Sequence, residues 1–183
     1  MVIIGNMSKR EIKIKMNNII GICCIDNKGS IGKDGGMLFH LPQDLKHFKR
    51  ITENHIIVCG RKTLDSLPNG KPLPNRSTIC LCSPQNNRED CFCINNFEEC
   101  LKLVLELAKT QQVFIIGGGQ IFELFGDFMT GLILTEVEAN GNGTIFFPTH
   151  ILDNFKLERK SGIIEENKLK YTFNYYKRKE LSE

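Results

Sequence analysis

The sequence predicts a single-domain α/β protein with a mixed, mainly parallel β-sheet, flanking helices and an antiparallel strand pair at the C-terminal end. Short apolar runs alternate with helical patterns through most of the 183 residues. These runs are almost continuously apolar, which is typical of strands buried on both faces of a parallel sheet. The segments over 156–164 and 169–179 are both strand-like and close together, so they predict the antiparallel pair.

The first half of the chain predicts four strands and two helices. Strands are expected over 18–25, 55–60, 77–83 and, in a shorter form, 91–95. Four glycines within residues 26–37 predict a long mobile loop rather than a strand. Pro42 suits the first turn of a helix that runs to about Ile51. A short helix is expected over 61–67, before the turn-rich segment 68–76.

The second half repeats this alternation. Asn96 is placed to cap a helix through Leu107, whose apolar residues recur three and four positions apart. A buried strand over 113–119 ends in three glycines, a helix begins in 120–125, and another strand follows over 132–139. No repeat or low-complexity linker divides the sequence, which predicts one domain over 18–183.

Composition narrows the classes of function. The hydrophobic content of 41% and the charged content of 25% are ordinary for a globular protein. A net charge of +3 favours neither a nucleic-acid nor a membrane partner, although it is compatible with a locally basic groove for an anionic ligand. No apolar run in the sequence reaches the roughly 18 residues that a membrane span needs.

Residues 1–17 are interpreted as an N-terminal extension and a candidate for disorder. They lack the apolar core and the small-residue cleavage site of a secretory signal. A misassigned start fits the same residues, because Met16 directly precedes the first predicted strand. A transit peptide is the alternative, weakened by the single arginine in the segment.

Eight cysteines raise the question of a disulfide or metal site. Without a secretory signal a disulfide framework is not expected, and most of the thiols are predicted to be small buried apolar groups. The alternative is a metal site built from Cys80, Cys82, Cys91 and Cys93. This pattern disfavours zinc, because zinc-binding pairs lie on tight turns whereas these pairs lie within strand-like runs. No metal is therefore predicted.

Two strand-to-helix turns are candidate phosphate-binding sites. Glycines 117–119 allow backbone to approach a ligand closely, although the segment is not G-x-G-x-x-G and a plain tight turn is the alternative. Residues 60–63 combine Arg61, Lys62 and a threonine at a helix start, for which a solvated basic corner is the alternative. Together the turns predict a dinucleotide, and the two cations favour one with an additional phosphate.

Asp44 is a candidate pocket acid. It shares a helix face with Leu41, Leu45 and Phe48, at spacings of three and four residues. A carboxylate among apolar neighbours is costly to desolvate unless it is paired, so its pKa is expected to rise. The alternative is that Asp44 merely stabilises the N-terminus of its helix. The residues alone leave both interpretations open.

Five segments in register resemble the dihydrofolate reductase family. They are IGKDGGMLFHLPQDLKHFK (31–49), GRKT (60–63), KPLPNR (71–76), IIGGG (115–119) and TEVEANGNGTIFFP (135–148). The resemblance covers about residues 18–148 and implies a dihydrofolate-reductase-like fold. It also implies hydride transfer from NADPH to 7,8-dihydrofolate, which supplies tetrahydrofolate to one-carbon metabolism and thymidylate synthesis. A cytoplasmic monomer that binds antifolates is expected from the same resemblance.

The resemblance assigns roles residue by residue. Asp44 matches the acid that orients the pterin and assists its protonation, and Arg76 matches the clamp on the glutamate tail. The remaining expected substrate contacts are Ile20, Ile22, Leu45, Phe48, Leu67, Leu73, Ile116 and Thr135. The expected cofactor contacts are Ile22, Ile31, Met37, Gly60, Arg61, Lys62, Thr63, Ser83, Ile116, Gly118, Gly119, Gln120 and Ile121. Residues 26–40 match the lid over the nicotinamide.

Several positions depart from the family pattern. Phe39 stands where tryptophan is usual, which removes an N–H donor near the acid, and Leu38 stands where proline is common. Phe122 provides no hydroxyl, and Cys82 replaces a serine or threonine near the ribose phosphate. Thr144 stands where an aspartate is expected, so lid closure is expected to differ.

Two other functions compete with this interpretation. One is a reductase of the same fold that acts on a different heterocycle, such as a pyrimidine of the riboflavin pathway. That family is not expected to pair the segment around Asp44 with the tail-binding segment 71–76. The other is a cysteine-rich metal or redox-sensing module, which elemental analysis would test.

Overall fold

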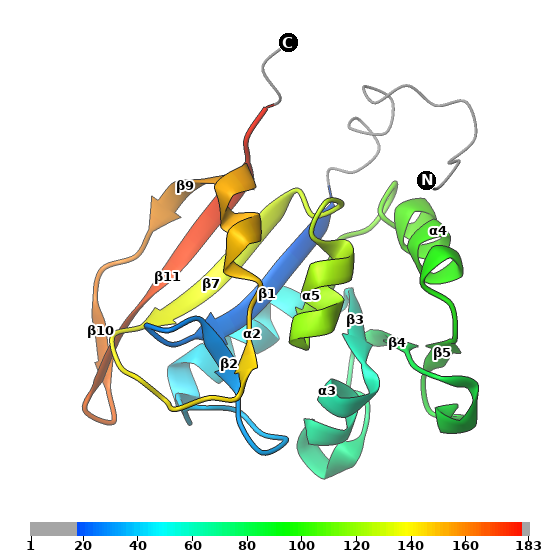
Figure 1. The fold of residues 1–183 in the computed structure, drawn as a ribbon, viewed down its shortest axis with the longest axis horizontal. Coiled ribbons are helices and arrows are strands. Elements are labelled where there is room, and N and C mark those ends of the chain that lie inside the picture. Colours follow the sequence, from blue (N-terminus) through cyan, green and yellow to red (C-terminus); the bar gives the residue numbers. More distant parts are fainter. Residues whose placement is uncertain (1–17, 181–183) are drawn as a thin grey trace.

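The computed structural model describes residues 18–180 (Figure 1). The extension interpreted over 1–17 lies outside the described residues. One large sheet runs through the molecule in the order β10-β11-β7-β1-β6-β3-β4-β5, and β9 pairs with β11 beside β10. No helix within residues 18–180 is long and apolar enough to cross a membrane.

The sheet is mixed but mainly parallel, as predicted. The parallel strands are β1 (Ile19–Ile25), β3 (Ile56–Gly60), β4 (Ser77–Leu81), β5 (Phe92–Ile94), β6 (Val113–Gly117) and β7 (Gly131–Val137). The antiparallel strands are β9 (Phe155–Lys160), β10 (Ile164–Glu166) and β11 (Leu169–Arg178). The antiparallel pair expected near the C-terminus is confirmed, although its first strand is divided into β9 and β10.

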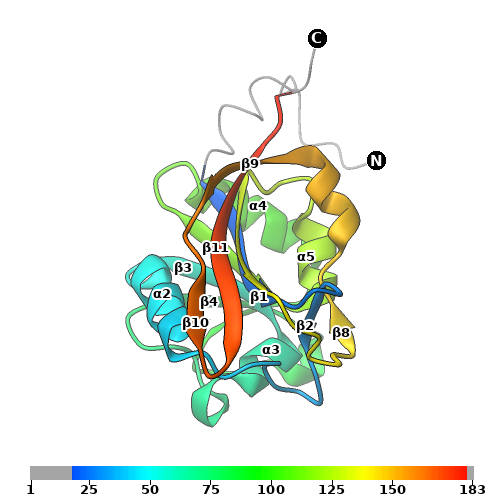
Figure 2. The ribbon, with the colours of Figure 1, turned by 90° about the vertical axis from the view of Figure 1, so that its left-hand side faces the viewer.

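Helices cover both faces of the sheet. Figure 2 shows α2 (Pro42–Thr52) on one side and α4 (Phe97–Leu107) with α5 (Gly119–Phe125) on the other. The short α3 (Arg61–Ser66) packs Leu64 against the buried Cys59 and Cys80. Three 3-10 turns complete the described helical elements: η1 (Pro68–Gly70), η2 (Pro84–Asn86) and η3 (Thr149–Asn154).

The predicted helix cap at Asn96 is present. Its side-chain oxygen accepts from the N–H groups of Glu98 at 2.8 Å and Glu99 at 3.2 Å. This satisfies two of the amides that a helix N-terminus leaves without backbone partners. The apolar residues of α4 and α5 then pack with β1, β3 and β6 in the larger core, where Phe122 and Phe125 are fully buried.

The loop predicted over 26–37 needs a correction, because it contains a strand. β2 (Ser30–Gly32) pairs antiparallel with β8 (Ile145–Phe146) in a separate two-stranded sheet. Phe147 N–H also donates to the Gly29 carbonyl at 2.9 Å. The glycine-rich composition alone gives no strand signal there, since β2 is stabilised by a partner from much later in the chain.

Candidate active site

The parallel strands end at one edge of the sheet, and the two candidate phosphate-binding turns meet there. β3 and β6 are direct neighbours, with Cys59 beside Gly117 in their register. Ligands of open α/β sheets generally bind at the carboxyl ends of the strands. The structure therefore brings residues 60–63 next to glycines 117–119, and the side chain of Ile121 packs against Gly60.

Asp44 lies in the first turn of α2 and reaches the sheet. Its Oδ1 accepts a hydrogen bond of 2.5 Å from Thr135 Oγ1. Thr135 is 3% exposed and lies on β7 beside Cys24 of β1. The hydrogen bond therefore holds the acid over two central strands rather than at the solvent side of its helix.

A different carboxylate caps α2. Leu41 occupies the N-cap position and makes no side-chain capping bond. The Gln43 N–H instead donates to both oxygens of Glu166, at 3.2 and 3.3 Å, and the Tyr171 hydroxyl donates to Glu166 Oε2 at 3.0 Å. Because Glu166 serves the helix terminus, the geometry favours the pocket interpretation of Asp44 over the helix-end alternative.

The surroundings of Asp44 alter its ionisation. Burial raises the pKa of this carboxyl above its usual 3.8, the Thr135 hydrogen bond lowers it, and the nearby charge of Glu166 raises it further. Burial is the largest of these effects. A carboxyl with a raised pKa retains its proton closer to neutral pH, as suits a group that assists protonation of a bound ligand.

The residues expected to contact substrate lie mostly on the sheet face beneath α2. Leu45 is half-buried next to the acid, and Leu67 packs in a neighbouring cluster that shares Ile116. Five members form one apolar cluster: Ile20, Ile22, Phe48, Leu73 and Ile116. An acid beside such a wall can bind one polar edge of a flat ring while the apolar side chains contact its faces.

Arg76 is fixed where the turn-rich segment meets β4. Its Nε donates to the Pro74 carbonyl at 3.0 Å, and its Nη1 donates to Thr52 Oγ1 at 3.1 Å. Its Nη2 makes no hydrogen bond within residues 18–180. Partial burial lowers the pKa of Arg76 from its ordinary value, and the guanidinium remains cationic at neutral pH. A guanidinium held in this way can bind a carboxylate in a fork.

Glycine is required in the turn between β6 and α5. Gly117 has a φ of +118°, and its peptide bond to Gly118 is cis. A Cβ on Gly119 would clash with the carbonyl group of Phe146. Gly119 and Gln120 also line an open hollow of about 540 Å³. Exposed backbone N–H groups in a turn without side chains can approach a phosphate closely.

Arg61 belongs to a polar network at the ends of β3 and β4. Its Nε donates to both oxygens of Asp65, at 2.9 and 2.7 Å, and its Nη1 donates to Asn86 Oδ1 at 2.7 Å. Asn86 Nδ2 donates in turn to Ser83 Oγ at 2.6 Å. Arg88 Nη1 lies 3.5 Å from the same Asp65 carboxylate. Two arginines thus share one counter-ion at the predicted ribose-phosphate site.

The other expected cofactor residues have diverse environments. Lys62 is exposed, while Thr63 Oγ1 lies 3.5 Å from where a Cβ on Gly118 would stand. Ile31 packs against the larger core, and the Met37 side chain is 64% exposed. Among these expected cofactor contacts, Met37 is therefore the one least held in place by other side chains of the protein.

The residues near the predicted lid that differ from the family pattern pack against specific neighbours. Phe39 packs in a cluster with the buried Leu41 and Tyr171. A Cβ on Gly141 would lie 3.1 Å from the side chains of both Leu38 and Phe39, so the two segments are in close contact. At the predicted lid contact, the Thr144 N–H donates to the Gly32 carbonyl at 3.0 Å, which is a backbone interaction.

Sequence reasoning missed two acidic residues of this site. Glu166 had no detectable signal, because its partner Gln43 lies in a different part of the sequence. Asp65 could have been found, since it lies four residues after Arg61 on α3 and that spacing brings opposite charges together on a helix.

Known proteins of one family are similar to this chain. The dihydrofolate reductase family matches residues 18–178. The dihydrofolate reductase of Bacillus subtilis (strain 168) is 34% identical over 165 residues, which cover 88% of this chain and 95% of that protein. That of Staphylococcus aureus (strain Mu50 / ATCC 700699) is 34% identical over 152 residues, or 81% of this chain and 91% of that protein.

A solved structure is also similar. The dihydrofolate reductase from Enterococcus faecalis, complexed with NADP(H) and RAB-propyl, superposes with a TM-score of 0.79 and 29% sequence identity. The match covers 90% of this chain and 98% of that one. The fold and the comparisons thus define an α/β enzyme, with a half-buried acid held against β7 of its sheet. The chain belongs to the dihydrofolate reductase family, a family of oxidoreductases.

Proposed function

We propose that this protein reduces 7,8-dihydrofolate to 5,6,7,8-tetrahydrofolate by hydride transfer from NADPH. The observation that carries the proposal is the Asp44–Thr135 hydrogen bond at the edge of an apolar cluster, in a chain of this family. The supply of tetrahydrofolate to one-carbon metabolism and thymidylate synthesis follows from this activity. The cytoplasmic location and the monomeric state expected from the sequence stay predictions.

Asp44 would bind the pterin. Its carboxylate accepts from an amino group and a ring N–H of the substrate, and this charge-assisted pair fixes the orientation of the ring. Thr135 holds the carboxyl in place through its hydroxyl. With its raised pKa, Asp44 assists protonation of the ring nitrogen next to the carbon that is reduced, while water delivers the proton.

The apolar cluster and Arg76 would bind the rest of the substrate. The faces of the pterin and of the adjoining aromatic ring contact the side chains beneath α2, where water is excluded. The Arg76 guanidinium pairs with the α-carboxylate of the glutamate tail through the nitrogen that no described residue occupies. The two polar anchors, Asp44 and Arg76, then define the position of the ligand from opposite ends.

The residues present fit a phosphorylated dinucleotide. No side chain projects from glycines 117–119, so the backbone N–H groups of this turn can approach a pyrophosphate, and Arg61, Lys62 and Ser83 supply donors for an additional phosphate. When bound, NADPH supplies the hydride. The similar enzyme from Enterococcus faecalis is complexed with NADP(H), which supports this choice of cofactor.

The direct test is an assay of NADPH oxidation by the purified full chain, with and without dihydrofolate. We expect oxidation to require dihydrofolate and methotrexate to compete with it. A pyrimidine substrate of the riboflavin pathway serves as the matched control and should not be reduced. Turnover of the pyrimidine without turnover of dihydrofolate would favour the rival reductase and overturn the proposal.

A further inference from the structure

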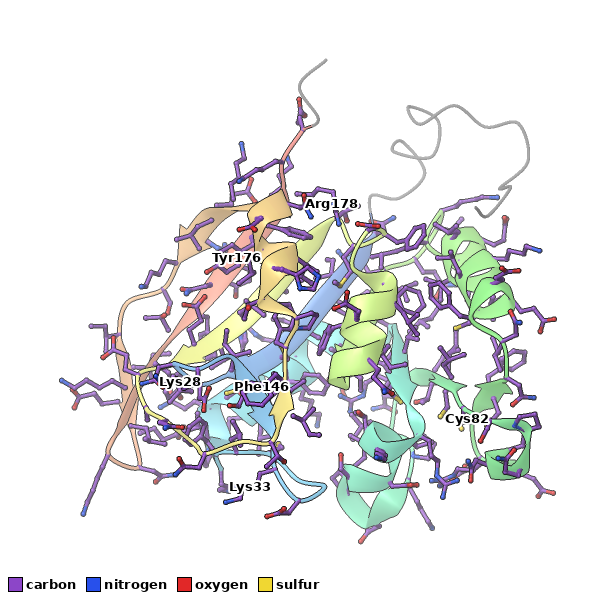
Figure 3. The ribbon with its side chains drawn as sticks, in the orientation of Figure 1. Lys28, Lys33, Cys82, Phe146, Tyr176 and Arg178 are labelled. Carbon is purple, nitrogen blue, oxygen red and sulfur yellow. The ribbon has the colours of Figure 1, made fainter. Side chains whose placement is uncertain are left out.

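Five cysteines lie together on one face of the β3-β4-β5 edge. Cys59 is in register with Cys80, and Cys80 is in register with Cys93. Cys82 and Cys91 lie two residues from members of this row, so they share its face. All five belong to a single cluster with Leu64, and none has a role in the proposed reaction. Figure 3 marks Cys82 beside β5 at this edge.

The cluster is not arranged for a metal ion. Among residues 18–180, no group of three or more histidine, cysteine or acidic side chains has a geometry that could hold one. The eight thiols are all free, and four are buried: Cys59, Cys80, Cys82 and Cys100. Chemistry at this edge is therefore restricted to the thiols that solvent can reach.

Cys91 and Cys93 meet that condition and lie close together. Both are half-buried, and their Sγ atoms are 3.6 Å apart. A disulfide needs the two sulfur atoms at about 2.05 Å, so rotation of the side chains must close the remaining gap. Alternate residues of a strand lie roughly 6.6 Å apart at Cα, which is near the upper end of the range that a disulfide tolerates.

The local backbone can adjust to this bond. β5 is only three residues long and is the outermost strand, with β4 as its single neighbour. Cys91 precedes the first residue of β5 and has no ladder partner in the β4 register. A small change of pleat at Cys91 therefore disrupts no hydrogen bond of the sheet ladder.

The two sulfur atoms have different environments. The Arg88 N–H donates to Cys93 Sγ at 3.2 Å, and the Cys93 thiol donates to the Arg88 carbonyl at 3.7 Å. Burial raises the pKa of Cys91 to about 12, and the neighbouring Cys93 adds to this effect. Because burial makes the Cys91 thiol hard to ionise, we assign Cys91 as the thiol that reacts second and resolves the mixed disulfide, and Cys93 as the attacking thiol.

We propose that Cys91 and Cys93 form an oxidisable dithiol, which a low-molecular-weight disulfide such as glutathione disulfide converts to an intramolecular disulfide. Cys93 loses its proton to solvent, and its thiolate attacks one sulfur of the oxidant and expels a first glutathione thiolate, which takes up a proton from solvent. Cys91 then loses its proton to solvent, attacks Cys93 Sγ and expels the second. One protein disulfide forms, one glutathione disulfide is reduced to two thiols, and the protons balance.

The pair is linked to the predicted ribose-phosphate site, and this part of the inference rests on the proposed function. Cys93 Sγ contacts the Arg88 backbone on both sides, accepting from its N–H and lying 3.7 Å from its carbonyl oxygen. Arg88 shares Asp65 with Arg61. If oxidation displaces Arg88, Asp65 is left to Arg61 alone, and Arg61 becomes less available to a phosphate.

The modification is tested by intact mass on the full chain. After incubation with glutathione disulfide we expect a loss of about 2 Da, mapped to the peptide that contains Cys91 and Cys93. The variants Cys91→Ser and Cys93→Ser should abolish this loss, and the control Cys100→Ser, at a buried thiol of α4, should keep it. No loss of mass, a reaction that stops at a glutathione adduct, or a disulfide mapped elsewhere in the wild-type protein would each overturn the proposal.

The coupling is tested on the same samples by steady-state kinetics. The oxidised protein should show a KM for NADPH raised by about two- to fivefold, the scale of a weakened exposed ion pair, with kcat unchanged. Treated Cys93→Ser protein should keep its KM. An unchanged KM in wild-type protein that intact mass shows to be fully oxidised would refute the coupling while leaving the disulfide itself established, because the mass measurement does not depend on the proposed function.

Discussion

The Thr135 hydroxyl donates a 2.5 Å hydrogen bond to Asp44 Oδ1 and joins β7 to the first turn of α2. Asp44 is thereby oriented toward the sheet before any ligand binds. Because the donor is 3% exposed, water cannot easily replace it. The geometry of the acid therefore depends on a side chain 91 positions away in the sequence.

Thr135→Val should impair the reaction without unfolding the protein. Valine has nearly the same shape but no hydroxyl, so Asp44 loses one partner and its orientation. A hydrogen bond to a charged group is worth about 1.5–3 kcal/mol, which corresponds to roughly 10- to 150-fold in kcat/KM. Thr172→Val, at an equally buried threonine of β11 that makes no contact with Asp44, is the matched control. Equal losses in both variants would contradict the role of Thr135.

Asp44→Asn should lose most turnover at neutral pH. Asparagine keeps an acceptor for Thr135 but cannot carry the charge that we propose pairs with the pterin, nor take the proposed part in its protonation. The expected loss of kcat/KM is about 10²- to 10⁴-fold, the usual range for an acid–base group. Near-normal kcat/KM at pH 7 in a variant with the wild-type circular dichroism spectrum would show that Asp44 does not have this role.

The same substitution should affect stability in a pH-dependent manner. The folded protein has a raised Asp44 pKa, so folding favours the protonated form. This contribution is fully present below the unfolded value near 3.8 and is lost as pH rises through the folded value. The difference in unfolding free energy, Asp44→Asn minus wild type, should therefore be larger at pH 7 than at pH 3. Chemical denaturation of both proteins without ligand at pH 3 and pH 7 measures this difference. An equal difference at the two pH values would contradict the predicted pH dependence.

Cofactor preference should respond in opposite directions to two substitutions in one ion pair. Arg61→Ala removes the proposed phosphate donor and should raise the KM for NADPH much more than that for NADH. Asp65→Asn releases Arg61 from its bidentate partner and should lower the KM for NADPH, by about two- to fivefold for an exposed pair. Glu106→Gln is the control, because Glu106 of α4 forms an exposed pair with Lys109, away from Arg61 and its partners. Equal effects of Arg61→Ala on both cofactors would contradict the ribose-phosphate assignment.

Local patterns in the sequence were sufficient for most of the fold. The alternation of apolar runs and helices predicted the main strands, and Asn96 was identified as a cap because capping involves residues only two and three positions away. β2 could not be predicted in this way. Its pairing with β8 is a long-range interaction, and the two strands are only three and two residues long, too short to show a periodic pattern.

The residues of the candidate site show the same distinction between local sequence patterns and long-range contacts. The turns at 60–63 and 117–119 were predicted because their glycines and cations are adjacent in sequence. Asp44 remained ambiguous because its distinguishing contact, Thr135, lies on another strand, and because the competing role at the helix terminus belongs to Glu166. The relation between Arg61 and Asp65 was accessible from i,i+4 spacing, whereas the involvement of Arg88 required the fold.

Glu166→Gln should separate the two effects of this carboxylate. Glutamine keeps an acceptor for the Gln43 N–H but removes the negative charge, so the interaction with the N-terminus of α2 should weaken by roughly 0.3–1 kcal/mol. The same charge raises the pKa of Asp44, so that pKa should fall in the variant. In the pH profile of kcat/KM, the ionisation assigned to Asp44 should therefore move to lower pH.

Glu165→Gln is the matched control for this prediction, because Glu165 is exposed, pairs with Lys170 and makes no hydrogen bond to α2. It should leave both the stability and the pH profile unchanged. A Glu166→Gln protein that is destabilised but keeps the wild-type pH profile would show that Glu166 acts on the helix alone. A displaced profile with unchanged stability would instead show that its charge reaches Asp44 without serving as a cap. Only a change in both the stability and the pH profile supports the conclusion that Glu166 positions α2 and also raises the pKa of Asp44.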